Sequence, residues 1–356
     1  MLSIGIIGFG FMGRTHWSAY RADGRARVTH VVDPILAQGE SASAGNISGG
    51  AGDGFDPADH VVLSDAEELF SSGAVQAVSI CTPTPSHVEL AARALRAGLH
   101  VLVEKPLALS SADAAEIIHV AAEHPEQHVM PAMCMRFWPG WDFLQRIIAS
   151  GAWGRVISAR FGRQCAVPAW GADFYGDVSR SGGALLDLHV HDVDYACWCF
   201  GVPRRVQSVG RSHGGRRYDH VVTSYDYGTD QPLVITEAQW HPVSEFPFSM
   251  HYLVVFEQAT VRYDSTTSPP ITIYRPDRVP EVIDPGPQTG YVGEVAHFLD
   301  IIDRRSRPIV TPDDAITALR VIEAERRSLD ADSAAVHVAL ADGVGTVDPG
   351  HARPQR

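Results

Sequence analysis

The sequence predicts two domains of different class: an α/β domain with a doubly wound parallel sheet, followed by an α+β domain with a large, mostly antiparallel sheet. The first third of the 356 residues alternates short apolar runs with helical patterns, which is typical of parallel βαβ units. In the second half, strand-like runs follow one another directly, which favours antiparallel pairing. A chain of this length can also bury two separate cores.

The first domain is expected over residues 1–130. Its strands are predicted at Leu2–Ile7, Val28–Asp33, Val61–Leu63, Ala74–Thr82, His100–Lys105 and His128–Cys134. Its helices are predicted at Gly13–Ala22, at Ser86–Ala97 with Ser86 as the cap and Gly98 as the stop, and at Ser111–Glu123. The glycine-rich stretch 38–60 favours a surface loop, which we interpret as an insertion, with a flap beside a bound cofactor as the alternative.

The second domain is expected over residues 131–344, and residues 345–356 are predicted to form a loose tail. Its strands are predicted at Val156–Gln164, Val206–Gly210, Val221–Tyr227, Leu233–Trp240, Met250–Glu257, Thr260–Tyr263 and Ile271–Tyr274. Its helices are predicted at Gly182–Phe200, Tyr291–Arg305 and Asp313–Asp330.

Composition excludes several classes of function. Apolar residues make up 45% and charged residues 20%, as in soluble globular proteins, and the net charge of −13 argues against nucleic acid or an anionic membrane as partner. No segment approaches the roughly 20 apolar residues of a membrane span, and the run Leu2–Ile7 is too short for the core of a signal peptide. The five cysteines, an odd number in apolar surroundings, indicate reduced thiols and a cytoplasmic protein.

A glycine-rich turn, Gly8-Phe9-Gly10-Phe11-Met12-Gly13, joins the first predicted strand to the first helix. In this context Gly8 permits a tight turn, Gly10 lets the backbone approach a pyrophosphate, and Gly13 allows the helix to pack closely. Asp33 ends the second strand, where its carboxylate is expected to bind ribose hydroxyls and to repel a 2′-phosphate. The turn and Asp33 therefore predict a Rossmann domain that binds NAD in preference to NADP.

Two further strand ends are expected at the same crevice, because loops at the carboxyl ends of parallel strands line it. Thr82 follows one strand, and Glu104-Lys105-Pro106 follows the next. Thr82, Glu104 and Lys105 are therefore candidate cofactor contacts, and the ammonium group of Lys105 can bind a hydroxyl of cofactor or substrate. A lysine at a strand end is ordinarily solvated, and the bond before a proline can be cis.

Asp187 and His191 stand four residues apart on the predicted helix 182–200, which stacks both side chains on one face. A carboxylate beside an imidazole holds one tautomer and raises the basicity of the ring, as a general base requires. His189 and His191 also suggest a metal site of metallohydrolase type, but Val193 stands where an aspartate would be needed. Because His189 points to the other side of the helix, we predict no metal and interpret His189 as a structural histidine.

As an ordered set, the glycine turn, Glu104-Lys105-Pro106 and Gly182-Gly183-x-x-x-Asp187-x-x-x-His191 resemble the glucose–fructose oxidoreductase/inositol dehydrogenase (Gfo/Idh/MocA) family. The resemblance covers nearly the whole chain, although Ser181 replaces the first glycine of the family's usual run. It implies a C-terminal sheet that often forms subunit interfaces, hence a homodimer or homotetramer. It also implies that Lys105, Asp187 and His191 are the catalytic residues.

These features predict an NAD-dependent oxidoreductase that transfers hydride between the nicotinamide and a secondary hydroxyl of a sugar, sugar derivative or cyclic polyol. Two alternatives stay open: an NAD-retaining glycoside hydrolase that acts by transient oxidation and elimination, and a non-catalytic NAD-binding regulator. The intact set of Lys105, Asp187 and His191 argues against the regulator. Candidate contacts of the small polyhydroxylated substrate are Arg136, Trp138, Trp170, Tyr175 and Tyr291.

Overall fold

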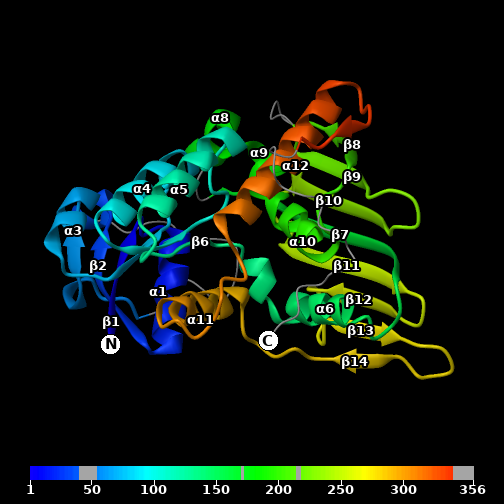
Figure 1. Ribbon diagram of the computed structural model, residues 1–356, viewed down its shortest axis with the longest axis horizontal. Coiled ribbons are helices and arrows are strands. Elements are labelled where there is room, and N and C mark those ends of the chain that lie inside the picture. The colour runs from blue at the N-terminus through cyan, green and yellow to red at the C-terminus, as the bar shows by residue number, and fades with distance from the viewer. Residues whose placement is uncertain (40–53, 170–171, 214–217, 340–356) are drawn as a thin grey trace. The chain divides into compact units, whose positions relative to one another are not determined.

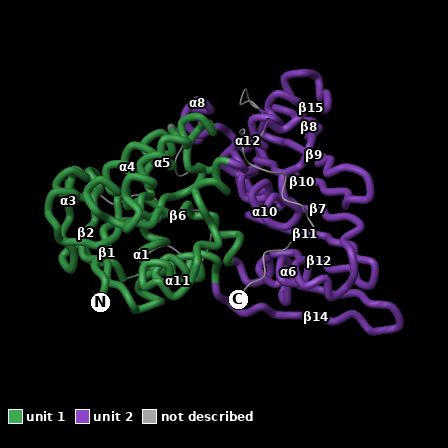
Figure 2. The backbone as a smooth tube through the Cα atoms, viewed as in Figure 1, with its two compact units in different colours: residues 1–137, 168–174, 289–316 green, residues 138–167, 175–288, 317–356 purple. Residues whose placement is uncertain are grey.

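A computed structural model describes residues 1–39, 54–169, 172–213 and 218–339 (Figure 1). The chain divides into two compact units (Figure 2). Unit 1 comprises the described residues of 1–137, 168–174 and 289–316, and unit 2 comprises the rest. The first unit therefore extends beyond residue 130 and includes a segment from the last third of the chain. The predicted tail 345–356 lies outside the described residues.

Unit 1 is built on a six-stranded parallel sheet with the order β3-β2-β1-β4-β5-β6. Its strands are β1 (Leu2–Ile7), β2 (Ala26–Val32), β3 (Val61–Leu63), β4 (Ala77–Ile80), β5 (His100–Val103) and β6 (Val129–Pro131). The strand order reverses between β1 and β4. In an open α/β sheet, ligands bind outside the carboxyl ends of the strands at such a reversal.

The helices of unit 1 pack on both faces of this sheet, with α4 and α5 on one face and α1 and α11 on the other (Figure 1). Their bounds are α1 (Phe11–Asp23), α2 (Pro34–Ala37), α3 (Ala66–Ser72), α4 (His87–Arg96), α5 (Ser111–Glu123) and α11 (Gly290–Ile302). Helix α11 lies against α1 because its buried face includes Glu294, Phe298 and Ile301. A helix distant in sequence therefore completes this unit.

Two local predictions for unit 1 are corrected by the structure. Ser86 precedes α4, but its side chain does not cap the helix, because its hydroxyl donates to Thr82 Oγ1 at 2.7 Å and to the Pro83 carbonyl at 2.8 Å. Part of the stretch 38–60, expected to be a surface loop, is helical, because a 3-10 helix covers Pro57–Asp59. Residues 40–53 of that stretch lie outside the described residues.

Unit 2 contains a nine-stranded sheet with the order β14-β13-β12-β11-β7-β10-β9-β8-β15. Among the described strands of this sheet, every pairing is antiparallel except that of β7 with β10, so the predicted mostly antiparallel sheet is confirmed. The strands are β7 (Val156–Ala166), β8 (Arg205–Arg211), β9 (His220–Asp226), β10 (Leu233–His241), β11 (Ser249–Phe256), β12 (Thr260–Asp264), β13 (Ile271–Tyr274), β14 (Glu281–Ile283) and β15 (Val336–His337).

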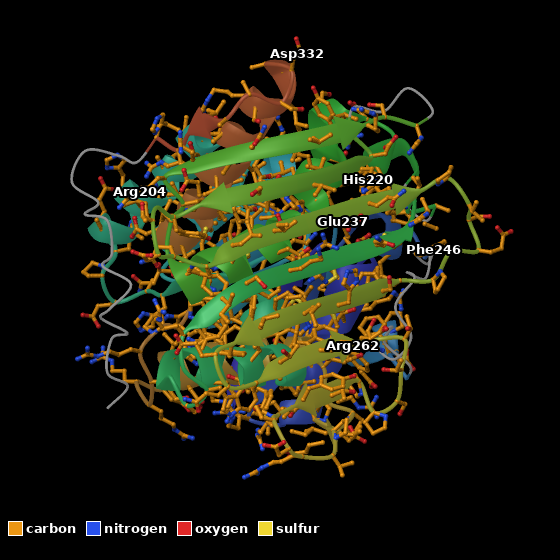
Figure 3. The ribbon with its side chains drawn as sticks, turned by 90° about the vertical axis from the view of Figure 1, so that its right-hand side faces the viewer. Arg204, His220, Glu237, Phe246, Arg262 and Asp332 are labelled. Atoms are coloured by element: carbon orange, nitrogen blue, oxygen red, sulfur yellow. The ribbon has the colours of Figure 1, made fainter. Side chains whose placement is uncertain are left out.

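Burial alternates along the central strands of this sheet, so one face lies against helices and the other faces outward (Figure 3). The helices are α6 (Pro139–Ser150), α7 (Ala172–Tyr175), α8 (Val178–Ser181), α9 (Gly183–Asp187), α10 (Val190–Phe200) and α12 (Pro312–Asp330). Most of α7 and the start of α12 belong to unit 1. Tyr195 and Tyr252 donate to backbone carbonyls of Trp141 and Gly140, at 2.6 and 2.8 Å, and so fasten α6 to α10 and β11.

The single helix predicted over 182–200 is wrong in one respect, because it is interrupted at Leu188 and His189. The Ala184 carbonyl accepts from both Leu188 N and His189 N, at 3.2 and 2.9 Å, and the next helix starts at Val190. One carbonyl that serves two amides widens the turn by one residue, as in a π-bulge. Among the described helices, none is both long and apolar enough to cross a membrane.

Candidate active site

The surroundings of the three glycines in the turn after β1 differ, as the position of an added Cβ atom at each of them shows. Gly8 has a φ of +86°, and a Cβ there would lie 2.8 Å from the Cys81 carbonyl carbon. A Cβ on Gly13 would lie 2.1 Å from the Gly8 oxygen, so α1 packs directly on the turn. A Cβ on Gly10 would meet nothing within 4 Å. Open space beside Gly10, at the start of a helix and at the sheet reversal, fits a dinucleotide pyrophosphate.

Asp33 connects this turn to the end of β2. Its Oδ2 accepts from the Phe9 amide at 2.7 Å, and its Oδ1 accepts from the amides of Ile35 and Leu36 at 2.9 and 3.0 Å. The residue is 9% exposed. Asp33 therefore supports the glycine turn and caps α2, and Oδ2 can accept one further hydrogen bond.

An aromatic cluster beside the turn was not foreseen from the sequence. The Phe9 ring lies 4.2 Å from the Phe55 ring, which in turn lies 5.4 Å from Trp17 and 4.6 Å from His60. The Arg14 guanidinium lies 5.1 Å from the Phe9 ring centroid. The end of the glycine-rich stretch thus packs against the turn through Phe55, a single aromatic residue whose isolation in that stretch was the available signal.

The loops after β4 and β5 are joined by His87, the first residue of α4. Its Nε2 lies 2.7 Å from the Thr82 carbonyl oxygen, and its Nδ1 lies 2.8 Å from the Pro106 carbonyl oxygen. The ring is 1% exposed. The backbone of the predicted cofactor contact Thr82 is therefore held to the turn that carries Lys105.

Lys105 stands out by exposure. From Val101 to Ala108 every residue is buried except Lys105, which is half-buried, and the Lys105–Pro106 peptide is cis. Glu104 faces inward, where Oε1 lies 2.9 Å from His16 Nε2 and Oε2 accepts from the Lys105 amide at 3.0 Å. The two neighbours thus separate, with the lysine accessible and the glutamate in the core.

Glu104 belongs to a buried cluster with His16 and Glu294. The ligand atoms of the three residues lie within 4.8 Å of one another, and this is the one group with metal-ligand spacing among the described residues. Burial raises the pKa of Glu104, but the hydrogen bond with His16 and the nearby charges of His16, Lys105 and His87 together outweigh it and leave the pKa below its ordinary value. Burial, with the nearby Glu104 carboxylate, holds the pKa of Glu294 well above its ordinary value.

In unit 2, Asp187 and His191 show the same pattern of exposure as Lys105. They are half-buried, whereas the other residues from Ser181 to Ala196 are all buried. Asp187 is the last residue of α9, and His191 is the second residue of α10. The break between the two helices therefore lies between these two partly exposed residues.

His189, in the break itself, points into the core of unit 2. Its Nε2 lies 3.2 Å from Glu325 Oε2 and 3.3 Å from Thr236 Oγ1, and the side chains of His189 and Glu325 are both fully buried. Burial lowers the pKa of His189, but the Glu325 carboxylate outweighs it and raises the pKa above its ordinary value. His189 is therefore engaged on the core side, in agreement with the structural role predicted for it.

Two family models match the chain. The model described as the oxidoreductase family, NAD-binding Rossmann fold, matches residues 2–132, and the GFO/IDH/MocA C-terminal domain matches residues 141–262. The chain belongs to the Gfo/Idh/MocA oxidoreductase family. The predicted family, the NAD-binding Rossmann domain and the second domain are thereby confirmed.

The Gfo/Idh/MocA relatives include named dehydrogenases. D-glucoside 3-dehydrogenase of Escherichia coli (strain K12) is 29% identical over 207 residues, which cover 57% of this chain and 55% of the relative. Trans-1,2-dihydrobenzene-1,2-diol dehydrogenase of Homo sapiens is 33% identical over 152 residues, which cover 41% and 44%. The chain thus spans about half the length of the curated relatives it matches.

The fold itself is shared over nearly the full length of solved structures. Levoglucosan dehydrogenase, solved in complex with NADH and levoglucosan, matches with a TM-score of 0.77 and 18% identity, over 95% of this chain and 100% of that chain. At this identity the likeness concerns the fold alone.

The predicted substrate contacts of this Gfo/Idh/MocA chain lie in different surroundings. Arg136 is 3% exposed, and its guanidinium donates to the Ile309 carbonyl at 2.8 Å and lies 3.5 Å from Asp314, which gives it a structural role inside unit 1. Tyr175 packs edge-on against Trp240, with ring centroids 6.0 Å apart. Trp138 precedes α6, and both it and Tyr291 of α11 are half-buried. Trp170 lies outside the described residues.

Proposed function

We propose that this protein is an NAD-dependent dehydrogenase that acts on a secondary hydroxyl of a sugar, sugar derivative or cyclic polyol. The observation that carries the proposal is the exposure of three reactive side chains. Lys105, Asp187 and His191 are half-buried within segments whose other residues are buried. A charged or basic group held at a surface by buried neighbours is positioned for a ligand rather than for the core.

The three side chains supply the groups that oxidation of an alcohol needs. Bound NAD supplies the hydride acceptor. His191 takes the hydroxyl proton as general base, and Asp187 orients the imidazole and stabilises its protonated form. The Lys105 ammonium binds the reacting oxygen and stabilises the negative charge that develops there. The names of the relatives, which are dehydrogenases of a glucoside and of a dihydrodiol, support a polyhydroxylated substrate.

Turnover against a panel of inositols, aldoses, anhydrosugars and glycosides tests this function. NADH formation and aglycone release are followed together, with Lys105→Met as the matched variant. We expect NADH formation in step with oxidised product and a loss of about 10²–10³-fold in Lys105→Met, because one charged donor at the reacting oxygen is removed. Aglycone release without net NADH would instead identify the NAD-retaining glycoside hydrolase.

The preference for NAD over NADP follows from the carboxylate of Asp33. A 2′-phosphate beside this buried carboxylate places two negative charges together, which weakens NADP binding. Titration of both cofactors into the wild type and Asp33→Ser tests this role. The variant is expected to bind NAD more weakly than the wild type does. The ratio of the NADP dissociation constant to the NAD dissociation constant should therefore be smaller in the variant. Tighter NADP than NAD binding by the wild type would contradict the proposal.

We also propose that the outward face of the nine-stranded sheet pairs with a second copy of this chain in a homodimer or homotetramer. This face mixes apolar and charged side chains: Leu253 is 43% and Leu233 55% exposed, and His220 lies 2.9 Å from Glu237 (Figure 3). Interspersed residues of both signs suit a self-complementary interface. Light scattering should show a dimer or tetramer that Leu253→Glu dissociates, whereas Val279→Glu in an exposed loop should not. A wild type that is monomeric in solution would contradict the proposed interface.

A further inference from the structure

The position of Lys105 depends on a carboxylate that faces the opposite way. Glu104 continues the strand through its amide, which donates to the Ile80 carbonyl at 2.9 Å. Its side chain then returns to the backbone of the next residue, where Oε2 accepts from the Lys105 amide at 3.0 Å. The carboxylate is thus bonded to the residue whose ammonium group serves the proposed reaction.

His16 holds the other oxygen of that carboxylate. His16 Nε2 lies 2.9 Å from Glu104 Oε1, and the side chains are 0% and 7% exposed. A charge-assisted hydrogen bond at this distance, away from water, fixes both partners in one geometry. Helix α1, which starts at the glycine turn, therefore reaches the Lys105 turn through a single residue.

Glu294 of α11 completes the cluster without a hydrogen bond of its own. Its Oε1 lies 4.0 Å from His16 Nε2, the side chain is fully buried, and neither carboxylate oxygen has a hydrogen-bond partner among the described residues. If Glu294 were ionised, its buried carboxylate would receive no hydrogen bond and would be repelled by the negative charge of Glu104. Burial and the nearby Glu104 carboxylate therefore favour the protonated form of Glu294.

We propose that Glu104 is a positioning residue for Lys105, held as a carboxylate by His16, and that Glu294 is a neutral acid that leaves the His16–Glu104 pair undisturbed. The groups that face Glu294 are His16 and Tyr20 of α1, Cys81 after β4 and Glu104 after β5. Arg136, in the short helix Cys134–Phe137 beside α11, instead binds the Ile309 carbonyl. The proposal rests on the proposed role of Lys105.

A double-mutant cycle between Glu104 and Lys105 tests the positioning role. Glu104→Gln is expected to lower kcat by about 10²-fold with NADH affinity retained, because a small displacement of a reacting group costs about that much. In the Lys105→Met background, Glu104→Gln should cause no further loss, since there is no ammonium group left to position. Independent, multiplicative losses would overturn the positioning role. A normal rate in Lys105→Met alone would instead overturn the proposed function.

The matched control for packing is Tyr20→Phe, in the same helix as His16. Tyr20 hydrogen-bonds to Ser79 Oγ of β4 at 3.0 Å, whereas Glu104 accepts from the amide of Lys105 itself. This variant should lower the melting temperature without a change in kcat. If Tyr20→Phe reduced kcat as much as Glu104→Gln at equal loss of stability, the effect of Glu104 would be one of packing alone.

The protonation of Glu294 is tested by Glu294→Gln, which has the shape of the neutral acid. Because the pKa of Glu294 is raised in the folded state, the wild type loses stability as pH rises above the unfolded value of about 4.3. The glutamine variant lacks this loss, so its melting temperature relative to wild type should rise with pH, and kcat should be retained. A variant that loses stability increasingly at high pH, or a divalent metal bound one per chain and lost in the variant, would overturn the proposal.

Discussion

Each unit buries a histidine against a glutamate, and the two pairs differ in what the glutamate does with its second oxygen. In unit 1, Glu104 binds His16 through Oε1 and the Lys105 amide through Oε2. In unit 2, Glu325 faces His189 through Oε2, and Oε1 accepts from the Tyr225 hydroxyl at 2.6 Å. The glutamate of the first pair is therefore hydrogen-bonded to the backbone of Lys105, and the glutamate of the second pair is hydrogen-bonded to a tyrosine of the sheet.

The charge around the two pairs differs as well. The unit 1 pair faces the carboxyl group of Glu294, whose Oε1 lies 4.0 Å from His16 Nε2 and which we propose to be protonated. Near the unit 2 pair lies a buried ion pair, Arg163 and Asp192, with Nη2 and Oδ1 3.3 Å apart. We therefore propose that the same pair of residue types positions a catalytic group in unit 1 and stabilises the core in unit 2.

The largest effect should separate His191 from its buried neighbour His189. His191→Ala is expected to lower single-turnover hydride transfer by about 10²–10⁴-fold with the fold intact, because the general base is removed. His189→Asn should keep the transfer rate per folded molecule and lose stability. Thermal unfolding identifies the folded variants. An unchanged transfer rate in folded His191→Ala would contradict the base assignment.

The next largest effect compares the two glutamates. Glu325→Gln is expected to cost about 3–5 kcal/mol of unfolding free energy, since it breaks a buried ion pair and leaves the other charge uncompensated. Its rate per folded molecule should be retained, in contrast to the loss expected for Glu104→Gln. Denaturant unfolding and active-site titration measure the two quantities. If both glutamine variants lost the same factor in rate per folded molecule, the proposal that Glu104 positions Lys105 while Glu325 only stabilises the fold would be contradicted.

Two tyrosines allow a smaller, matched comparison. Tyr225→Phe removes a hydrogen bond to a carboxylate and should cost about 1.5–3 kcal/mol, whereas Tyr20→Phe removes a bond between two hydroxyls and should cost about 0.5–1.5 kcal/mol. Both side chains are buried, so packing losses are similar. Equal costs for the two variants would indicate that Glu325 carries no charge in the folded protein.

The smallest effect expected is a dependence of stability on pH. The pKa of His189 is raised in the folded state, so the stability it contributes is fully present below about pH 6.5 and is lost as pH rises through the folded pKa. The difference in unfolding free energy between wild type and His189→Asn should therefore shrink as pH increases. A difference that grows with pH would show that His189 is neutral at all pH values studied.

Local patterns in the sequence predicted most of the elements but not every one. The bounds of β1, β3, α5 and β13 agree with the predictions, because apolar periodicity over a few residues reports which face is buried. Helices α3 and α6 and the short strands β14 and β15 were not predicted. Helix α6 has two features that are typical helix signals in a sequence, a proline at its first position and Gly151 after its end.

By itself, the sequence determined the glycine turn and the strand that precedes Lys105, because each depends on residues within one or two turns of chain. Only the tertiary structure decided which partners the buried charges meet. Glu104 binds a histidine 88 residues away, α11 brings Glu294 to the same place, and Glu325 draws His189 to the core side of a broken helix. A buried charge must be compensated wherever the fold supplies a partner, and no local pattern encodes that position.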